Sequence, residues 1–142
     1  MLPSRPDWDN YFISICRSVS ARGDCRRRQV GSVIVHSNRI ISTGYNGTDP
    51  GSPGCLDGNC PRGLCPYKVV PIYYEYSNCI AIHAEVNAGR QAQELGLTHL
   101  LPHATLYVSE RPCTDCQQAA RAVGLPKVLC PVDDGGIEYI FL

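Results

Sequence analysis

The first regular hydrophobic pattern along the chain lies near the N-terminus and has a helical period. Apolar side chains recur there every three or four residues, at Trp8, Tyr11, Phe12, Ile15, Cys16 and Val19. This spacing predicts one amphipathic helix from about Asp7 to Ser20, with Asp7 placed to cap its first turn. Two β-rich runs follow at 30–35 and 39–43, and the short turn between them predicts a hairpin.

The rest of the chain begins with a long irregular segment and then alternates helices and strands. Residues 45–76 are rich in Gly, Pro and Cys and show no helical period. They predict a long loop that either serves a function or is held in place by some other group. The elements expected after it are a helix over 82–95, a strand over 104–109, a helix from Pro112 to about Val123, and strands over 128–132 and 137–142. This order predicts a layered α/β fold around one mixed sheet, with residues 1–142 forming a single domain.

Length, charge and cysteine content narrow the function. The 142 residues suit one domain, and 13 basic residues balance 13 acidic ones, so a nucleic-acid partner is not expected. No apolar run approaches the roughly 20 residues that cross a bilayer, and the N-terminus lacks a signal-peptide pattern. We therefore expect no membrane partner and a cytoplasmic location in a bacterial or phage-infected cell. In such a reducing compartment, nine cysteines favour metal binding over disulfides.

Two short motifs carry the candidate chemistry. His83 and Glu85 stand at the start of one predicted helix, and Cys113 and Cys116 follow Pro112 at the start of another. Two thiolates at this spacing can face one point, and helix N-termini stabilise them. With the histidine they make three zinc ligands and leave a fourth position for water, whose pKa zinc can lower to about 7. Glu85 is then the expected catalytic residue, placed to accept and pass on the proton of that water.

Each motif alone has an ordinary explanation. A His-x-Glu triplet occurs by chance in many helices, and a Cys-x-x-Cys pair also serves redox and structural zinc sites. Together, in this order and with a proline before the first cysteine, they form the signature of zinc-dependent deaminases. A thiol–disulfide oxidoreductase would leave the His-Ala-Glu triplet unexplained, and a zinc-stabilised binding module without catalysis would have no use for Glu85.

The sequence around these motifs resembles the cytidine and deoxycytidylate deaminase superfamily and, within it, the deoxycytidylate (dCMP) deaminase family. The matching segments lie within about residues 8–131 and are Ala21-Arg22 with Cys25 and Val30-Gly31, Gly44-Tyr45-Asn46-Gly47, His83-Ala84-Glu85-Val86-Asn87-Ala88, and Leu106-Tyr107-Val108-Ser109. The resemblance implies a three-layer α/β fold, in which helices flank a mixed five-stranded sheet.

The resemblance also implies roles for residues that contact the substrate. Asn46 would hydrogen-bond the sugar or the base, and Arg22, with Arg27, would hold the 5′-phosphate. The backbone N–H of Ala84 and a backbone carbonyl near Arg111 would read the pyrimidine edge.

Two features depart from the family pattern. Arg111 precedes Pro112, where relatives usually have a small or aromatic residue, so it either reshapes the pocket wall or supplies an extra basic group. Only residues 131–136 separate the last two strands, which leaves no room for the helix that the family usually has there.

The remaining cysteines fall into two groups. Soft thiolates in or beside the long loop predict a second, structural zinc, and the resemblance matches Cys25 and Cys55 to it best. The expected ligands are Cys25, Cys55, Cys60 and Cys79, with Cys65 as the alternate. Cys16, on the helical stripe, and Cys130, in a predicted strand, are expected in the core.

The leading hypothesis is hydrolytic deamination of dCMP to dUMP, which feeds thymidylate synthesis. The alternative is a deaminase of another cytosine substrate: CMP, a modified or biosynthetic cytosine nucleotide, a nucleoside, or a base in tRNA or single-stranded DNA. A nucleic-acid deaminase needs a positive track and stacking aromatic side chains, and the zero net charge disfavours the first of these. The resemblance further implies dCTP and dTTP as effectors and a homo-oligomer.

Overall fold

A computed structural model of the chain describes residues 4–25, 28–48, 51, 53–57 and 82–142. Its elements in chain order are α1 (Trp8–Ser20), β1 (Gly31–His36), β2 (Arg39–Tyr45), the 3-10 helix η1 (Cys55–Asp57), α2 (Ala84–Glu94), the 3-10 helix η3 (Thr98–His103), β3 (Thr105–Val108), α3 (Thr114–Ala122), β4 (Lys127–Pro131) and β5 (Ile137–Phe141). The expected order of helices and strands is confirmed, and no end of an expected helix or strand differs by more than two residues.

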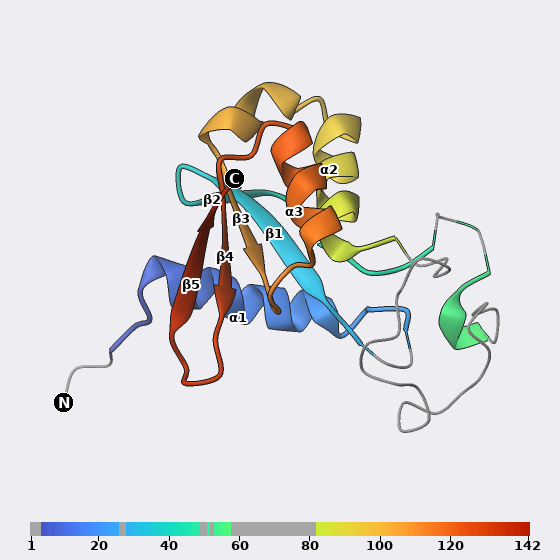
Figure 1. The fold of residues 1–142 in the computed structure, drawn as a ribbon, viewed down its shortest axis with the longest axis horizontal. Coiled ribbons are helices and arrows are strands. Elements are labelled where there is room, and N and C mark those ends of the chain that lie inside the picture. The colour runs from blue at the N-terminus through green and yellow to red at the C-terminus, as the bar shows by residue number, and fades with distance from the viewer. Residues whose placement is uncertain (1–3, 26–27, 49–50, 52, 58–81) are drawn as a thin grey trace.

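The strands form one mixed sheet with the order β2-β1-β3-β4-β5. Neighbouring strands are antiparallel except for β3 and β4, which are parallel and joined through α3. Helix α1 crosses one face of the sheet, and α2 and α3 lie together on the other face (Figure 1). The predicted three-layer α/β fold is therefore confirmed.

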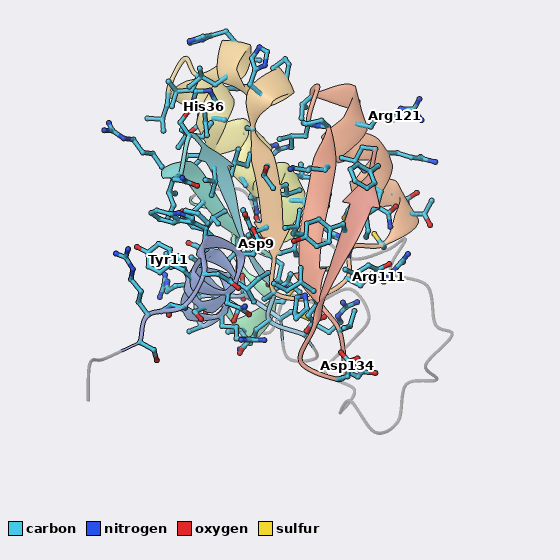
Figure 2. The ribbon with its side chains drawn as sticks, turned by 90° about the vertical axis from the view of Figure 1, so that its left-hand side faces the viewer. Asp9, Tyr11, His36, Arg111, Arg121 and Asp134 are labelled. Carbon is cyan, nitrogen blue, oxygen red and sulfur yellow. The ribbon has the colours of Figure 1, made fainter. Side chains whose placement is uncertain are left out.

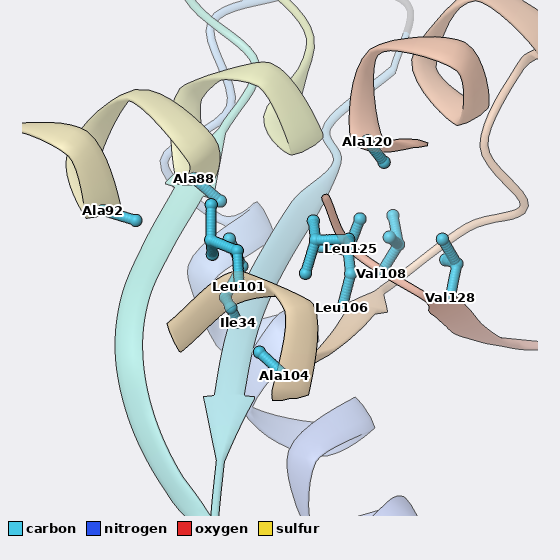
Figure 3. Packing of buried hydrophobic residues seen from close by; sticks show 10 residues of the cluster. All are labelled: Ile34, Ala88, Ala92, Leu101, Ala104, Leu106, Val108, Ala120, Leu125 and Val128. Carbon is cyan, nitrogen blue, oxygen red and sulfur yellow. The ribbon is translucent and has the colours of Figure 1, made fainter. Parts of the chain in front are cut away.

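Alternating side chains of the central strands divide the core into two clusters. On β1, Ile34 belongs to the cluster under α2 and α3, whereas Val33 and Val35 belong to the cluster under α1. Figure 3 shows the first cluster, which contains Ile34, Ala88, Ala92, Leu101, Ala104, Leu106, Val108, Ala120, Leu125 and Val128. Successive side chains of a strand point to opposite faces, so the helices on both faces pack against the same central strands.

The two cysteines expected in the core are there. Cys16 and Cys130 are both fully buried. Burial raises the pKa of Cys16 to about 12 and that of Cys130 to about 11, so both side chains remain neutral thiols at physiological pH.

Two glycines allow the helices on either face to approach the sheet closely. A Cβ atom on Gly31 would lie 2.2 Å from the carbonyl oxygen of Cys16 in α1. A Cβ atom on Gly44 would lie 2.4 Å from both the carbonyl oxygen of Ala84 and the backbone nitrogen of Ala88, at the start of α2. Only a residue without a side chain fits at either position, so these glycines set the distance between helix and sheet.

The structure adds two local details to the expected elements. Helix α3 begins at Thr114 rather than at Pro112, because Cys113 has extended backbone angles and serves as its N-cap. The 3-10 helix η3 was not expected, since six residues that include Pro102 show no helical period. The connection between β4 and β5 is a tight turn without a helix, as the sequence predicted.

Most of the expected loop 45–76 lies outside the described residues, and η1 is the helical turn described within it. Among the helices of the described residues, none has the length and apolar character needed to cross a bilayer.

Candidate active site

The N-terminal ends of α2 and α3 meet on one side of the sheet (Figure 1) and bring the two sequence motifs together. His83 is the N-cap of α2, Cys113 is the N-cap of α3, and Cys116 lies in the first turn of α3. Both cap residues have extended backbone angles and make no side-chain capping hydrogen bond. Their side chains are therefore available to a ligand, beside backbone N–H groups that favour negative charge.

The ligand atoms of these three residues form a compact triangle. The Nδ1 atom of His83 lies 2.8 Å from Sγ of Cys116 and 3.7 Å from Sγ of Cys113, and the two sulfur atoms are 3.2 Å apart. Tetrahedral zinc, with sulfur at about 2.3 Å and nitrogen at about 2.0 Å, spaces its ligand atoms by about 3.5–3.8 Å. The donor set therefore fits zinc after shifts of less than about 1 Å, and the three residues could hold a metal ion.

Glu85 lies beside this triangle in the first turn of α2. Its side chain is buried, with 7% of the residue exposed. Burial, reinforced by the adjacent Glu85 carboxylate, raises the pKa of the Cys116 thiol far above its usual range. A buried carboxylate next to a three-ligand site can exchange a proton with a reactant there without serving as a ligand.

Two side chains to which the sequence analysis gave no role, Ser32 and Asn87, fix the start of α2. The Ser32 hydroxyl of β1 donates to the carbonyl oxygen of Ala84 at 2.9 Å and also contacts the Gly44 carbonyl oxygen at 3.3 Å. The Asn87 amide donates to the carbonyl oxygen of Tyr45 at 2.8 Å. Ser32 stands within an apolar strand and is fully buried, and a buried hydroxyl needs a hydrogen-bond partner. A polar residue in that run was therefore the signal from which the contact with Ala84 could have been predicted.

The described residues directly after β2 lie next to the metal-binding triangle. Gly47 and Ile82 exchange two backbone hydrogen bonds, of 2.9 and 2.7 Å, and Ile82 directly precedes His83. This pairing holds the neighbouring Asn46 near the site. The side-chain amide of Asn46 is already bonded to the backbone. Its Nδ2 donates to the Arg28 carbonyl oxygen, and its Oδ1 accepts from the Val30 N–H, both at 2.9 Å.

The other residues expected to bind substrate have different surroundings. The Arg22 guanidinium carbon lies 5.8 Å from the ring centroid of Tyr45, and both side chains are exposed. Arg27 lies outside the described residues. Ala84 is buried in the first turn of α2, where a backbone N–H has no partner within the helix. The Arg111 guanidinium pairs with Glu138 of β5, its Nε lying 3.2 Å from Oε2.

The expected second zinc site is described only in part. Cys25 and Cys55 are both buried, and a carboxylate links their neighbourhoods, because Asp24 accepts hydrogen bonds from the backbone N–H groups of Cys55 and Leu56. The other expected ligands, Cys60, Cys79 and the alternate Cys65, lie outside the described residues. Within the part of the chain that the structure describes, the group able to hold a metal is His83, Cys113 and Cys116.

Comparison with known proteins gives matches over most of the chain. Residues 6–131 match the family model of the cytidine and deoxycytidylate deaminase zinc-binding region. A deoxycytidylate deaminase of Mycobacterium phage D29 is 41% identical over 132 residues, covering 90% of this chain and 97% of the phage protein. A deoxycytidylate deaminase of Schizosaccharomyces pombe is 37% identical over 88% of this chain, which spans 37% of that longer protein.

Solved structures share the fold. The dCMP deaminase of cyanophage S-TIM5, solved with dCMP and dUMP, has a TM-score of 0.68 and 22% identity, with 91% of this chain and 84% of that chain covered. A cytidine deaminase from Burkholderia pseudomallei has a TM-score of 0.61 and 14% identity, with 93% and 91% covered. At these identities the likeness concerns the three-layer arrangement of helices and sheet.

Proposed function

Since the chain belongs to the cytidine and deoxycytidylate deaminase family, we propose that it catalyses the hydrolytic deamination of dCMP to dUMP. The observation that carries this proposal is the buried carboxylate of Glu85 beside the triangle of His83, Cys113 and Cys116. The phage D29 relative, which is named a deoxycytidylate deaminase, supports dCMP as the substrate. The dUMP formed would supply thymidylate synthesis.

The proposed reaction assigns a separate task to each part of the site. His83, Cys113 and Cys116 would hold zinc, which when bound supplies a Lewis acid that activates water near neutral pH. Glu85 would accept the proton that the water loses as its oxygen attacks C4 of cytosine. The same carboxylate would deliver that proton to ring N3, then accept the remaining proton of the hydroxyl added at C4 and pass it to the amino group, which leaves as ammonia while the C4 carbonyl forms.

The substrate contacts are proposals of the same kind. The Asn46 amide uses one hydrogen of Nδ2 and one lone pair of Oδ1 for the backbone. The second hydrogen and the second lone pair can each make one further hydrogen bond, to the sugar or base. Arg22, with Arg27, would bind the 5′-phosphate, supported by the exposure of Arg22 above Tyr45. The Ala84 N–H and a carbonyl near Arg111 would read the pyrimidine. Because the Arg111 guanidinium is paired with Glu138, its proposed contribution is the backbone.

The remaining proposals concern the protein as a whole. We propose a second, structural zinc bound by Cys25, Cys55, Cys60 and Cys79, with Cys65 as the alternate, and the burial of Cys25 and Cys55 supports it. Its thiolate ligands, like those of the first site, need a reducing compartment, which supports a cytoplasmic location. The family resemblance supports a homo-oligomer of single-domain chains and regulation by dCTP and dTTP.

The test measures ammonia release from dCMP, CMP, deoxycytidine, dCTP and single-stranded DNA, together with the zinc content of each preparation. We expect turnover of dCMP and a fall in kcat of at least about 100-fold for Glu85→Gln, with zinc retained. The matched control is Glu94→Gln, which removes an exposed carboxylate from the other end of α2 and should keep full activity. Turnover of polymers or nucleosides alone would reject dCMP as the substrate, and zinc binding without any turnover would favour a binding module.

A further inference from the structure

The segment that leads from β3 to the first cysteine ligand is held by hydrogen bonds to residues from distant parts of the chain. Ser109 and Gly31 exchange two hydrogen bonds, since the Ser109 N–H donates to the Gly31 carbonyl oxygen at 2.9 Å and the Gly31 N–H donates to Ser109 Oγ at 3.0 Å. Glu110 accepts from the Arg28 guanidinium. Ser109 and Glu110, the first two residues on the path toward Cys113, are thus each bonded to a residue that is distant in the sequence.

Arg111 continues this series with a partner on the last strand. Its Nε lies 3.3 and 3.2 Å from the two carboxylate oxygens of Glu138, in β5. Figure 2 shows the Arg111 side chain beside the two C-terminal strands. Glu138 is opposite Cys130 in the pairing of β4 with β5, and Ile140 on the same face of β5 packs against the cluster under α2 and α3. The carboxylate therefore belongs to the face of the sheet that carries the active site.

The peptide between Arg111 and Cys113 is stiff. Pro112 is buried and has a fixed φ angle, and it also restricts the backbone of the residue before it. Its carbonyl oxygen accepts a hydrogen bond from Gln117 Nε2 at 3.1 Å. A displacement of Arg111 is therefore passed on to Cys113, the N-cap of α3, rather than absorbed by the chain between them.

We propose that Glu138 is a positioning residue for the metal site, acting through Arg111. By holding the guanidinium, the carboxylate sets the path of the peptide that enters α3 and thereby the placement of the Cys113 and Cys116 thiols relative to His83. This inference rests on the proposed zinc site. It gives a role to an arginine where relatives usually have a small or aromatic residue, and to a strand that follows β4 directly, where the family usually has a helix.

The neighbouring residue provides a matched control. Tyr139 is the next residue of β5 and points to the opposite face, where its hydroxyl donates to Asp9 Oδ2 of α1 at 2.7 Å. Loss of that hydrogen bond loosens β5 without affecting Arg111. Because Arg111 and Glu138 are partly exposed, their ion pair adds little to global stability. Removing the pair should therefore lower zinc affinity while leaving the melting temperature almost unchanged.

The experiment compares zinc affinity, measured by competition with a chromogenic chelator, in the wild type, Glu138→Ala, Glu138→Gln and Tyr139→Phe. We expect Glu138→Ala to bind zinc about two- to fivefold more weakly, because an exposed pair at a protein surface has a modest effect. Glu138→Gln keeps an oxygen that can accept from Arg111 Nε and should recover part of this loss. Tyr139→Phe should lower the melting temperature and leave zinc affinity unchanged.

Two outcomes would overturn the inference. Equal zinc affinity in Glu138→Ala and the wild type would show that the pair does not position the ligands. Equal weakening by Glu138→Ala and Tyr139→Phe would assign the effect to general loosening of β5. A wild-type protein that binds no zinc would instead reject the proposed function, and with it the site that Glu138 is proposed to position.

Discussion

The contact between Gly44 and the start of α2 allows a quantitative test of how the sheet positions the active site. In Gly44→Ala, the new Cβ atom would lie 2.4 Å from two backbone atoms of α2, whereas real Cβ contacts essentially never fall below 3.0 Å. Helix α2 or strand β2 must therefore move by about 0.6 Å, and overpacking of this kind costs about 1–3 kcal/mol. For a domain of this size, we expect a fall in melting temperature of about 4–12 °C.

The clash should also affect the metal site, because the two backbone atoms that the new Cβ would meet belong to Ala84 and Ala88, beside His83 and Glu85 at the start of α2. We expect Gly44→Ala to bind zinc more weakly and to have a lower kcat, measured by chelator competition and ammonia release. Differential scanning fluorimetry at a fixed zinc concentration gives the change in melting temperature. The variant tests whether the close packing of α2 on β2 is needed for the geometry of the ligands.

Gly89→Ala is the matched control for this prediction. Gly89 lies within α2, and no described atom outside its own helical turn lies within 4 Å of where its Cβ would be. Alanine in a helix interior is favoured over glycine by about 0.5–1 kcal/mol, so the same substitution should raise the melting temperature by about 2–4 °C. Gly44→Ala with wild-type stability and zinc affinity would refute the steric argument, and so would equal destabilisation by both variants.

Two further predictions concern buried polar groups. Ser32→Ala should lower stability by about 1 kcal/mol because it removes the hydroxyl that bonds the Ala84 carbonyl oxygen, whereas Ser42→Ala should cost less, since the buried Ser42 hydroxyl has no partner among the described residues. Urea unfolding of the two variants measures this difference, and equal losses would contradict it. Burial and the nearby Glu85 raise the pKa of Cys116, so the metal-free thiol stays protonated through neutral pH and zinc must displace its proton. Apparent zinc affinity should therefore rise about tenfold per pH unit for each proton released between pH 6.5 and 8, and a pH-independent affinity would contradict this.

Much of the fold could be predicted because buried positions recur at regular intervals along helices and strands, and apolar residues occupy them. The helical stripe through Phe12 and Cys16 is the buried face of α1, and the alternation of Val33 with Ile34 separates the two clusters of the core. The meeting of His83 with the two cysteines was predicted on different grounds. The order of the two motifs, each at the start of a predicted helix, and the zinc-ligand chemistry of their side chains indicated one shared site.

Other features depend on contacts that no local pattern records. Arg111 and Glu138 are 27 residues apart, so the sequence marked Arg111 as unusual before Pro112 without indicating that its partner is Glu138. Asn46 was expected to face the substrate, yet its amide also bonds the backbone at Arg28 and Val30, because the segment that leads into β1 passes directly beside it. The sequence supplies the chemical type of such side chains, but their partners depend on how distant segments pack.

The last strand has one further consequence, for the fidelity of strand pairing. Tyr139 and Tyr107 both donate to the carboxylate of Asp9, which lies between α1 and the sheet (Figure 2), while Glu138 reaches Arg111 on the opposite face. A slip of β5 by one residue would exchange the faces of its side chains and turn Glu138 toward Asp9. Two carboxylates would then meet, and the arginine would lose its partner. Strand β5 lies at the edge of the sheet and exposes Phe141, so its hydrophobic pattern alone fixes the register only weakly. Repulsion between the two carboxylates adds a second term that disfavours the slipped register.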